Sequence, residues 1–475
     1  MPQRGGCHRY ARPLRRAAGC VAWISAALLL ASPGSAQTLT EAFAYAYNNN
    51  PQLLAQRALL RATDETVPQA LASWRPTVNF NGAAGYTRGA FEVPTFTGAS
   101  TPTQFSSFVT KSMSLSVTQP VYRGGRTEAA TRQAINNVQA TRAQTLGVET
   151  TVFQAVAQAY LDVVRDQALV EVNRNNEGVL RKQLEATRDR FRVGEVTRTD
   201  VAQAEAALAQ ATAQRITSEG TLESDRANFT RAVGHPPGRL ILPRERPVLP
   251  ATRDEALSLA AGDNPNVIAA SFTELAARNN VDVVRGQLLP QIQIVGTLSR
   301  SFAPSFTQQN DRLDSASVVA QLTMPLYEGG AVYSQTRQAQ QTVGQRRSQV
   351  DDARRQAVQT ATQAWETLQA ARAAIASFGA AVKAAEIALA GTQQEALVGS
   401  RTVLDVLQAE QTLFNTQQQL VGAQHDAALA EFNLAAATGR LIAPEMRLPV
   451  KLYDMERHYR EVKDKLLGFG GGLKE

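Results

Sequence analysis

The sequence predicts a mainly α-helical protein with a small β part, built from two copies of one structural unit. Three observations predict this fold class: an internal duplication, long proline-free stretches of helical composition, and short runs in which apolar and polar residues alternate. Ordinary globular helices run about 8 to 20 residues, so the much longer stretches here are typical of a coiled coil or a helical tube.

The N-terminal residues have the pattern of a cleavable secretory signal. Five arginines precede an apolar run over 21–30, and a small-residue stretch follows it up to Ala36. This run is too short for a membrane-spanning helix, which needs about 20 residues. We therefore expect the signal peptide 1–36 to be removed. Both cysteines, Cys7 and Cys20, would leave with it, so the mature chain would hold no thiol, disulfide or lipid anchor.

The charge balance without the signal argues against a nucleic-acid-binding protein. The signal carries five of the 49 basic residues and none of the 42 acidic ones, which leaves 44 minus 42, or +2. Nucleic-acid recognition needs a concentrated basic surface and aromatic stacking platforms, whereas here the charges are scattered and aromatic residues are few. We expect no nucleic acid partner.

The duplication is visible in short motifs at constant offsets. Asn50-Pro51 recurs as Asn264-Pro265, which is 214 residues later, and Gly124-Gly125 recurs as Gly329-Gly330, which is 205 residues later. The change in length therefore falls between about residues 87 and 111 and their counterparts, where we expect a variable surface loop. The predicted units are a first repeat over 37–241, a second repeat over 242–441, and a tail over 442–475 that is partly disordered or wrapped around the helices.

Each repeat is expected to contribute one β-hairpin, over 76–122 and over 290–327. Apolar and polar residues alternate in both runs of each hairpin, which is strand periodicity. A soluble sheet with one face on a core is the alternative, but no other apolar block is free to cover that face, and lipid outside with water inside suits a transmembrane barrel. Four strands are fewer than the ~8 of the smallest barrels, so closure would need several subunits. The predicted apolar face comprises Val78, Phe80, Leu115, Val117, Ile292, Ile294, Leu298 and Leu322.

Two long helices are expected over 126–191 and 331–397, with shorter returning helices over 200–233 and 404–438. Neither long stretch contains proline, and each would span on the order of 100 Å at 1.5 Å per residue. In 404–438 apolar pairs recur every seven residues, which favours left-handed supercoiling, and a second column at the same step holds small residues. An antiparallel two-helix coiled coil remains an alternative, whereas a curved wall of helices would use both columns.

Tight turns over 192–199 and 397–404 join each long helix to its returning helix. Gly194 and Gly399 can take the left-handed conformation that commonly ends a helix, and Thr199 or Asp200 can cap the helix after the first turn. A purely structural turn would explain these residues. The two turns are much more alike than the helices around them, which suggests that both meet a common partner. The candidate docking residues are Gly194, Glu195, Val196, Thr197, Gly399, Ser400, Arg401 and Thr402.

The order of elements and three motifs carry a resemblance to a known family. The motifs are Asn-Pro at 50–51, Gln-Pro-Val-Tyr-x-Gly-Gly at 119–125 and Val-Gly-x-x-Thr-x-x-Asp-Val-x-x-Ala-Glu at 193–205. Over residues 38–441 the chain resembles the TolC family of outer-membrane efflux proteins. The resemblance implies a homotrimer whose twelve strands form one barrel in outer-membrane lipid, continuous with a long periplasmic tube of α-helices. It also implies export of small molecules or proteins together with a periplasmic adaptor and an inner-membrane pump or ABC transporter.

The resemblance further implies a periplasmic gate just beyond the turns. Asp405 lies four residues after Arg401, so the two side chains can pair on one helix face, and Asp200 occupies the equivalent place in the first repeat. In the family an aspartate at the position of Asp405 lines the constriction, and an arginine at that of Arg401 helps tie neighbouring helices shut. The sequence departs from the family at Gln408, where a second aspartate is usual, and at Ala396, where a tyrosine often stands. An exposed pair of little energetic weight is the alternative.

An enzyme and a secreted periplasmic coiled-coil adaptor or scaffold are the competing functions. The mature chain has three histidines, His235, His425 and His458, without a zinc-binding pattern, and it shows no phosphate loop or nucleophile elbow. We expect no catalysis, no cofactor and no metal site, so a partner would supply the energy for transport. The sequence does not separate multidrug efflux from type I protein secretion.

The barrel hypothesis also predicts a topology. The hairpin connections 88–111 and 300–316 would lie outside the cell, because they carry the only substantial length difference between the copies. Tyr122 and Tyr327, at matching ends of predicted strands, would mark the periplasmic membrane interface as belt aromatics.

Overall fold

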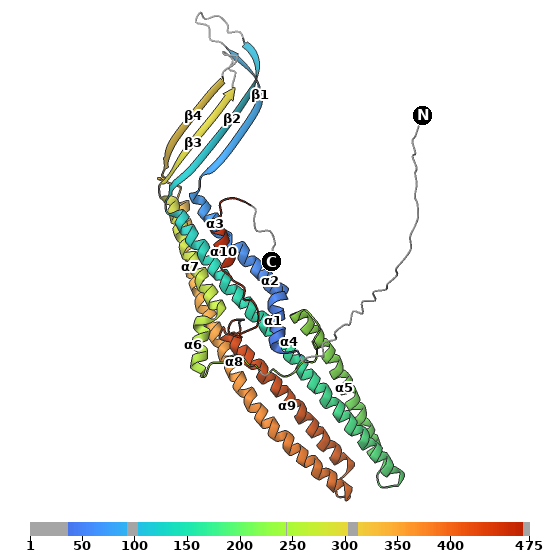
Figure 1. The fold of residues 1–475 in the computed structure, drawn as a ribbon. Coiled ribbons are helices and arrows are strands. Elements are labelled where there is room, and N and C mark those ends of the chain that lie inside the picture. Colours follow the sequence, from blue (N-terminus) through green and yellow to red (C-terminus); the bar gives the residue numbers. More distant parts are fainter. Residues whose placement is uncertain (1–36, 93–102, 244, 303–311, 469–475) are drawn as a thin grey trace, which may run out of the picture.

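A computed structural model describes residues 37–92, 103–243, 245–302 and 312–468, so the predicted signal peptide lies outside the described residues. Within them a β-sheet stands at one end of an elongated array of helices (Figure 1). The elements in chain order are α1 Leu39–Asn49, α2 Pro51–Asp64, α3 Thr66–Leu71, η1 Ala72–Trp74, β1 Thr77–Glu92, β2 Thr103–Arg123, α4 Arg126–Arg192, α5 Arg198–Val233, α6 Arg253–Asp263, α7 Pro265–Arg285, η2 Gly286–Leu288, β3 Gln291–Phe302, β4 Arg312–Thr323, α8 Ala331–Leu397, α9 Val403–Ala437 and α10 Arg457–Val462.

The two Asn-Pro pairs separate the short helices of each repeat, as predicted. Asn50 caps α2 and Asn264 caps α7, each with its side-chain oxygen, and proline follows at the first helical position, where its missing N–H would have had no helical partner. The side-chain amides also donate across the structure, from Asn50 to the Ala232 carbonyl and from Asn264 to the Ala437 carbonyl, both at 3.1 Å. Each pair therefore holds the short helices against the last turn of the returning helix.

The four strands form one antiparallel sheet in the order β1-β2-β3-β4. The two predicted hairpins join because β2 also pairs with β3, from Lys111 opposite Phe302 to Arg123 opposite Gln291. Within the described residues, β1 and β4 are the edges of the sheet and have a strand on one side only. Their outer backbone groups are free to pair with another chain.

The strand register places the predicted apolar residues on one face of the sheet. Residues directly opposite in antiparallel strands point to the same side, and Phe80, Leu115 and Leu298 form one such row across three strands. Val78 and Val117 pair in the next row, and Leu322 pairs with Ile292. The other face carries mostly Asn, Ser, Thr and Gln. In a single chain the large side chains of the apolar face are exposed, so no other described part of the chain packs against this face.

The strands extend further than the sequence suggested. Arg88 pairs with Ser107 inside β1 and β2, and the strands continue to Glu92 and from Thr103. The expectation that all of 88–111 and 300–316 is loop is therefore wrong, because β3 runs to Phe302 and β4 begins at Arg312. The remaining connections lie outside the described residues. In these extensions apolar and polar residues alternate only weakly. The strands still form there because each pairs with its neighbour and because Thr, Ser and Phe tolerate the extended backbone.

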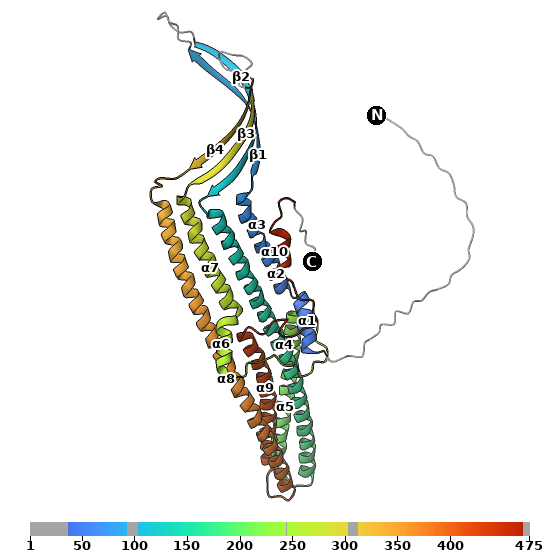
Figure 2. The same cartoon turned by 60° about the vertical axis from the view of Figure 1, so that its left-hand side comes forward.

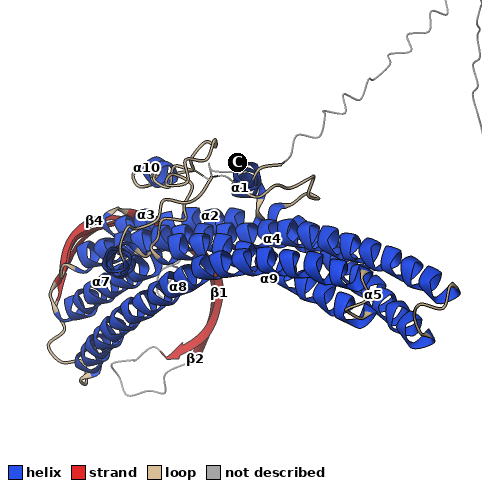
Figure 3. Ribbon diagram, turned by 90° about the horizontal axis from the view of Figure 1, so that it is seen from below, coloured by secondary structure: helices blue, strands red, loops and turns tan. Residues whose placement is uncertain are grey.

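The helical part is built from two antiparallel pairs. α4 and α8 have 67 residues each, so each spans about 100 Å, and α5 and α9 return along them for about half that length. The prediction of two very long helices is thereby confirmed. Both pairs end on the side away from the sheet (Figure 2). In the view from below, the long helices run across the picture as a curved layer, with α1, α2 and α10 on its convex side (Figure 3).

The main core lies where the two repeats meet, about halfway along the helices. Phe43 of α1, Phe153 of α4 and Phe432 of α9 are fully or almost fully buried, and the Phe43 ring centroid lies 5.0 Å from that of Phe153 and 6.0 Å from that of Phe432. A second cluster joins α6, α7, α8 and α9 through Ala, Val and Leu side chains. The small column predicted in α9 contributes Ala430 and Ala437 to this second cluster, where close helix approach requires small side chains.

The tail packs against the outside of the helices, with contacts as far as Lys465, whose carbonyl accepts from Arg75 Nη1 at 2.9 Å. Leu448 joins the main core, and the Tyr453 backbone N–H donates to the Tyr47 hydroxyl at 2.9 Å. Further on, Arg142 pairs with Glu456 at 3.1 Å, and α10 lies beside α2. Of the two expectations for the tail, packing against the helices holds for 442–465, and 469–475 lie outside the described residues.

Candidate functional site

The two tight turns lie side by side at the end of the helices farthest from the sheet (Figures 1 and 2). Near them Leu180 of α4 and Ala211 of α5 pack against Val403 and Leu407 of α9. Val196, in the first turn, packs against the same cluster. The structure thus brings together the candidate docking and gate residues of the two repeats, which lie 205 positions apart in the sequence.

Each turn is made by a glycine in the left-handed region. Gly194 has φ +82° and Gly399 has φ +79°, and the added Cβ of another residue would meet no atom within 4 Å at either position. Backbone bonds close the turns, from Glu195 N–H to the Arg190 carbonyl and from Ser400 N–H to the Glu395 carbonyl, both at 3.0 Å. The glycines are therefore required by backbone conformation alone, and the space beside them is open to a partner.

The helix after each turn begins with a reciprocal cap. Thr197 and Thr402 are the capping residues, and their hydroxyls donate to Asp200 and Asp405 at 2.8 Å. The expectation of Thr199 or Asp200 as the cap is wrong: Asp200 is the third helical residue, whose carboxylate also accepts from the Thr197 backbone N–H at 2.8 Å. The same bonds lower the pKa of Asp405, with the backbone N–H of Thr402 as the largest cause.

Arg401 does not bond to Asp405, which corrects the predicted pair. Its Nε donates to Glu395 Oε2 at 2.9 Å, back to the end of α8. The carboxylate of Asp405 is held by the cap of its own helix, and Arg401 precedes that helix, so the spacing rule for two residues within one helix does not apply. Gln408 is exposed one turn further along α9. Arg401 therefore closes its own turn, and Asp405 and Gln408 remain gate candidates.

The sequence missed the apolar surface at the tips. Val193 and Val398, which precede the two glycines, are 72% and 81% exposed, and Leu397 is 64% exposed. These three side chains belong to no buried cluster of the described residues, so they are suited to burial against another protein. The doubled Val-Gly step in the sequence was the available signal.

The sequence also missed Glu410, five residues after Asp405 in α9. It is 4% exposed, and burial raises the pKa of this carboxyl to about 7 although Gln393 of α8 hydrogen bonds to it. Its repeat counterpart, Glu205, is exposed and pairs with Arg188 at 2.6 Å. The two repeats therefore differ electrostatically next to the tips, and at neutral pH the second one holds a carboxyl that is partly protonated.

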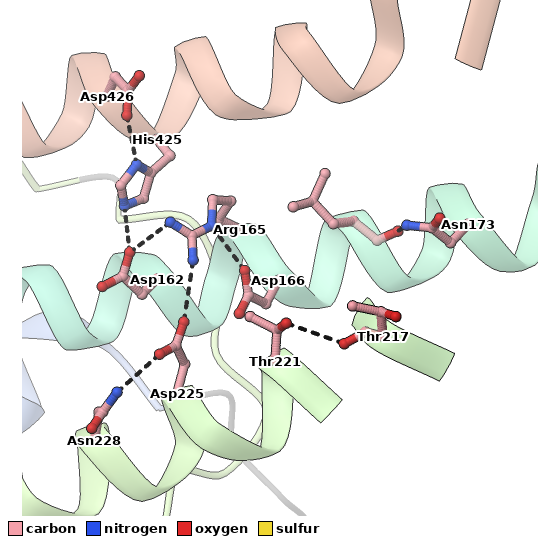
Figure 4. Close-up of polar contacts among 11 residues, drawn as sticks. Asp162, Arg165, Asp166, Asn173, Thr217, Thr221, Asp225, Asn228, His425 and Asp426 are labelled. Atoms are coloured by element: carbon pink, nitrogen blue, oxygen red, sulfur yellow. Dashed lines mark hydrogen bonds and ion pairs between the residues drawn. The ribbon is translucent and has the colours of Figure 1, made fainter. Parts of the chain in front are cut away.

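A partly buried charge network joins the two repeats higher up the helices (Figure 4). Arg165 of α4 contacts Asp162 at 2.9 Å and Asp166 at 2.8 Å on its own helix, and Asp225 of α5 at 3.1 Å. His425 of α9 lies 2.9 Å from Asp162 through Nε2 and 2.9 Å from Asp426 through Nδ1. With four carboxylates against one guanidinium, a protonated His425 brings the network closer to neutrality.

The network makes the link between α4 and α9 sensitive to pH. Burial lowers the pKa of His425, but the hydrogen bonds and charges of Asp162 and Asp426 outweigh it, and the net shift is upward. A histidine whose pKa is raised in the folded state stabilises the fold below its unfolded pKa and loses that effect as the pH rises through its folded pKa.

We therefore expect the melting temperature to fall by about 2–4 °C between pH 6 and pH 8, and His425→Gln to reduce this change; Glu410, whose pKa is about 7, contributes a change in the same direction. Circular dichroism in a fixed concentration of urea measures it. His235→Gln, which removes a histidine outside the network, is the matched control and keeps the wild-type slope. An equal slope in wild type and His425→Gln would show that other groups cause the pH dependence.

The chain has relatives among known proteins. The chain matches the family model described as outer membrane efflux protein over residues 44–235 and 256–440. It is 34% identical over 446 residues to the outer membrane efflux protein BepC of Brucella suis biovar 1 (strain 1330), with 94% of each chain covered. It is 26% identical to the alkaline protease secretion protein AprF of Pseudomonas aeruginosa, with 62% of each chain covered. The Campylobacter jejuni CmeC outer membrane channel superposes with a TM-score of 0.74 at 15% identity, over 90% of this chain and 89% of that one.

Proposed function

Because this chain belongs to the outer membrane efflux protein family, we propose that three copies of it form one exit duct, coupled at its helical tips to a periplasmic adaptor and through it to an inner-membrane pump. The chain is an outer-membrane channel protein with a helical tube that extends into the periplasm. Its relatives are channel proteins, and we infer that it transports without catalysing a reaction.

The open sheet is the observation that carries the proposal. A four-stranded sheet with two free edges and an uncovered apolar face is incomplete in one protomer. Pairing β1 of one copy with β4 of the next, three times over, gives twelve strands and removes every edge. The apolar face then meets lipid, and the polar face lines the water-filled lumen.

The helices support the same assembly. One 18-residue stretch of α8 is long and apolar enough to cross a membrane by length and composition, yet only 6% of it is buried in the protomer. A curved layer with its short helices on the convex side would place this surface against the next copy when three layers close into a tube. The apolar stretch of α8 belongs to the helical part, away from the sheet that we place in the membrane. Packing against the next subunit would therefore account for it.

The tips support docking. Val193, Leu397 and Val398 offer exposed apolar side chains around two left-handed glycines, and this arrangement accepts the surface of a helical partner without steric obstruction. The two turns lie together within each copy, so a trimer would present six of them in a ring.

The cargo is proposed from the relatives. The efflux protein BepC matches 94% of the chain, which favours efflux of small molecules. The secretion protein AprF, similar over 62%, is the observation that favours type I protein secretion with an ABC transporter. Mild crosslinking in cells followed by identification of the co-purified pump separates the two.

Conductance of the purified trimer in a planar bilayer tests both duct and gate. We expect a heat-sensitive trimer with a small closed-state conductance. Arg401→Ser should raise it several-fold by releasing Glu395 and loosening the turn, and Asp405→Ala should weaken block by multivalent cations, because three carboxylates around an axis attract cations. Arg198→Ser removes a positive charge from the other helix start and serves as control. If the wild-type protein forms no trimer and shows no conductance, the proposed duct is rejected. If the conductance of Arg401→Ser and the cation block of Asp405→Ala both equal those of wild type, only the proposed gate residues are rejected.

A further inference from the structure

A cluster of positive side chains interrupts the apolar face of the sheet near its far end. Arg300 of β3 lies in the row after Leu298, and the next row places Lys111 of β2 opposite Phe302, which is in turn opposite Arg312 of β4. By the register, all of these side chains are on the apolar face that the proposed barrel turns toward lipid. Lys111, Arg300 and Arg312 are solvent-exposed in the protomer.

The cluster is compact and partly fixed in position. Asp314 of β4 accepts from Arg300 Nε at 2.6 Å and from Arg300 Nη2 at 3.2 Å, and from Arg312 Nε at 3.0 Å. This one carboxylate holds both guanidiniums side by side, with Lys111 on the adjoining strand. Three positive charges against one negative charge leave +2, and the half-exposed guanidiniums keep donors for a further anion.

The position of the cluster along the barrel identifies the lipid layer that it faces. Tyr122 and Ile292 pair at the tube end of this face, and Phe302 lies ten residues further along β3. Ten residues span about 33 Å of strand, which is about 25 Å of barrel height at the usual tilt of 35–45°. That height equals the apolar band of an outer-membrane barrel, so Phe302 stands in the outer aromatic girdle, with Lys111 and Arg312 beside it.

We propose that Lys111, Arg300 and Arg312 form a binding site for the phosphate groups of lipopolysaccharide in the outer leaflet. Beyond the apolar band, in water, these three side chains would have no lipid beside them. In the aromatic girdle they face the headgroups of the outer leaflet, where the phosphates of a glycolipid carry the complementary negative charge. Arginine can bind phosphate through two parallel hydrogen bonds, and lysine adds a point charge. The proposal rests on the outer-membrane trimer proposed above. Three such sites around the barrel would fix its height in the membrane.

Native mass spectrometry of the detergent-purified trimer tests the site. The probes are bisphosphorylated lipid A, the same lipid after removal of its phosphates, and phosphatidylglycerol. We expect wild type to bind bisphosphorylated lipid A about tenfold or more tightly than either other lipid. The variant Lys111→Gln/Arg300→Gln/Arg312→Gln should lose this preference, because each lost charge-assisted hydrogen bond is worth about tenfold.

Two controls keep the result decisive. The variant Lys111→Arg/Arg300→Lys/Arg312→Lys retains the charges and should retain the preference for phosphate. Neutralising three cations outside the sheet, with Lys182→Gln/Arg231→Gln/Arg239→Gln, should leave binding unchanged. Equal binding of the phosphate-free lipid or of phosphatidylglycerol, or full binding by the glutamine variant, would overturn the site. Binding is measured only for variants that form heat-sensitive trimers. If the wild-type protein itself forms no such trimer, the result rejects the proposed duct and not the lipid site.

Discussion

Gly399→Trp should abolish export while leaving a membrane-inserted, heat-sensitive trimer. Gly399 has φ +79°, and the space beside it is open in the protomer, so the indole would project from the tip without disturbing the cores. We expect export to fall at least about tenfold, because a bulky side chain at the centre of the proposed docking surface prevents close backbone approach. Export of a marker substrate in cells lacking the wild-type gene, with trimer quantified on unboiled gels, measures both effects.

Two further variants separate bulk from backbone strain and from position. Gly399→Ala imposes the same positive φ on a side chain that adds little volume, and it should keep most of the export. Gly220→Trp places an indole on an exposed part of α5 where an added Cβ meets no atom within 4 Å, away from the tips, and should also keep export. Wild-type export by Gly399→Trp would show that the second turn is not a docking surface. Loss of the trimer would assign the effect to folding.

Gly124→Val should prevent folding at the junction of sheet and tube. Gly124 has φ +62°, and a Cβ there would lie 2.4 Å from the Gly286 carbonyl oxygen and 2.7 Å from Leu289 Cβ. Both are parts of the chain that follows α7 into β3, so neither can move aside without displacing a strand. We expect a loss of about 3 kcal/mol or more, from strain at positive φ together with the clash, and little or no trimer in the membrane.

The second repeat supplies the matched control for this prediction. Gly329 is the counterpart of Gly124 and has φ +63°, but an added Cβ would meet no atom within 4 Å in the protomer. Gly329→Val therefore carries the backbone strain without the close approach, and we expect reduced but detectable trimer. Equal trimer yields from Gly124→Val and Gly329→Val would mean that the approach of Gly124 to Gly286 contributes nothing to folding.

The sequence by itself determined the local features of this protein. Helix ends follow from Asn-Pro pairs and left-handed glycines, whose effects act within a few residues, and α8 begins and ends at the residues predicted for it. Strand faces follow from alternation, because successive side chains of a strand point to opposite sides. The duplication fixed the architecture, since each copy repeats the same order of elements.

Only the tertiary structure decided which distant residues meet. Strand pairing extended β1 and β2 beyond their alternating segments, because a backbone ladder depends on the neighbouring strand as well as on side chains. Arg401 bonds to Glu395 across the turn, a partner that spacing within one helix could not indicate. His425 meets Asp162, and Gly124 meets Gly286, through packing of elements from different repeats. Such contacts arise from the relative placement of whole helices and strands, which local sequence patterns do not encode.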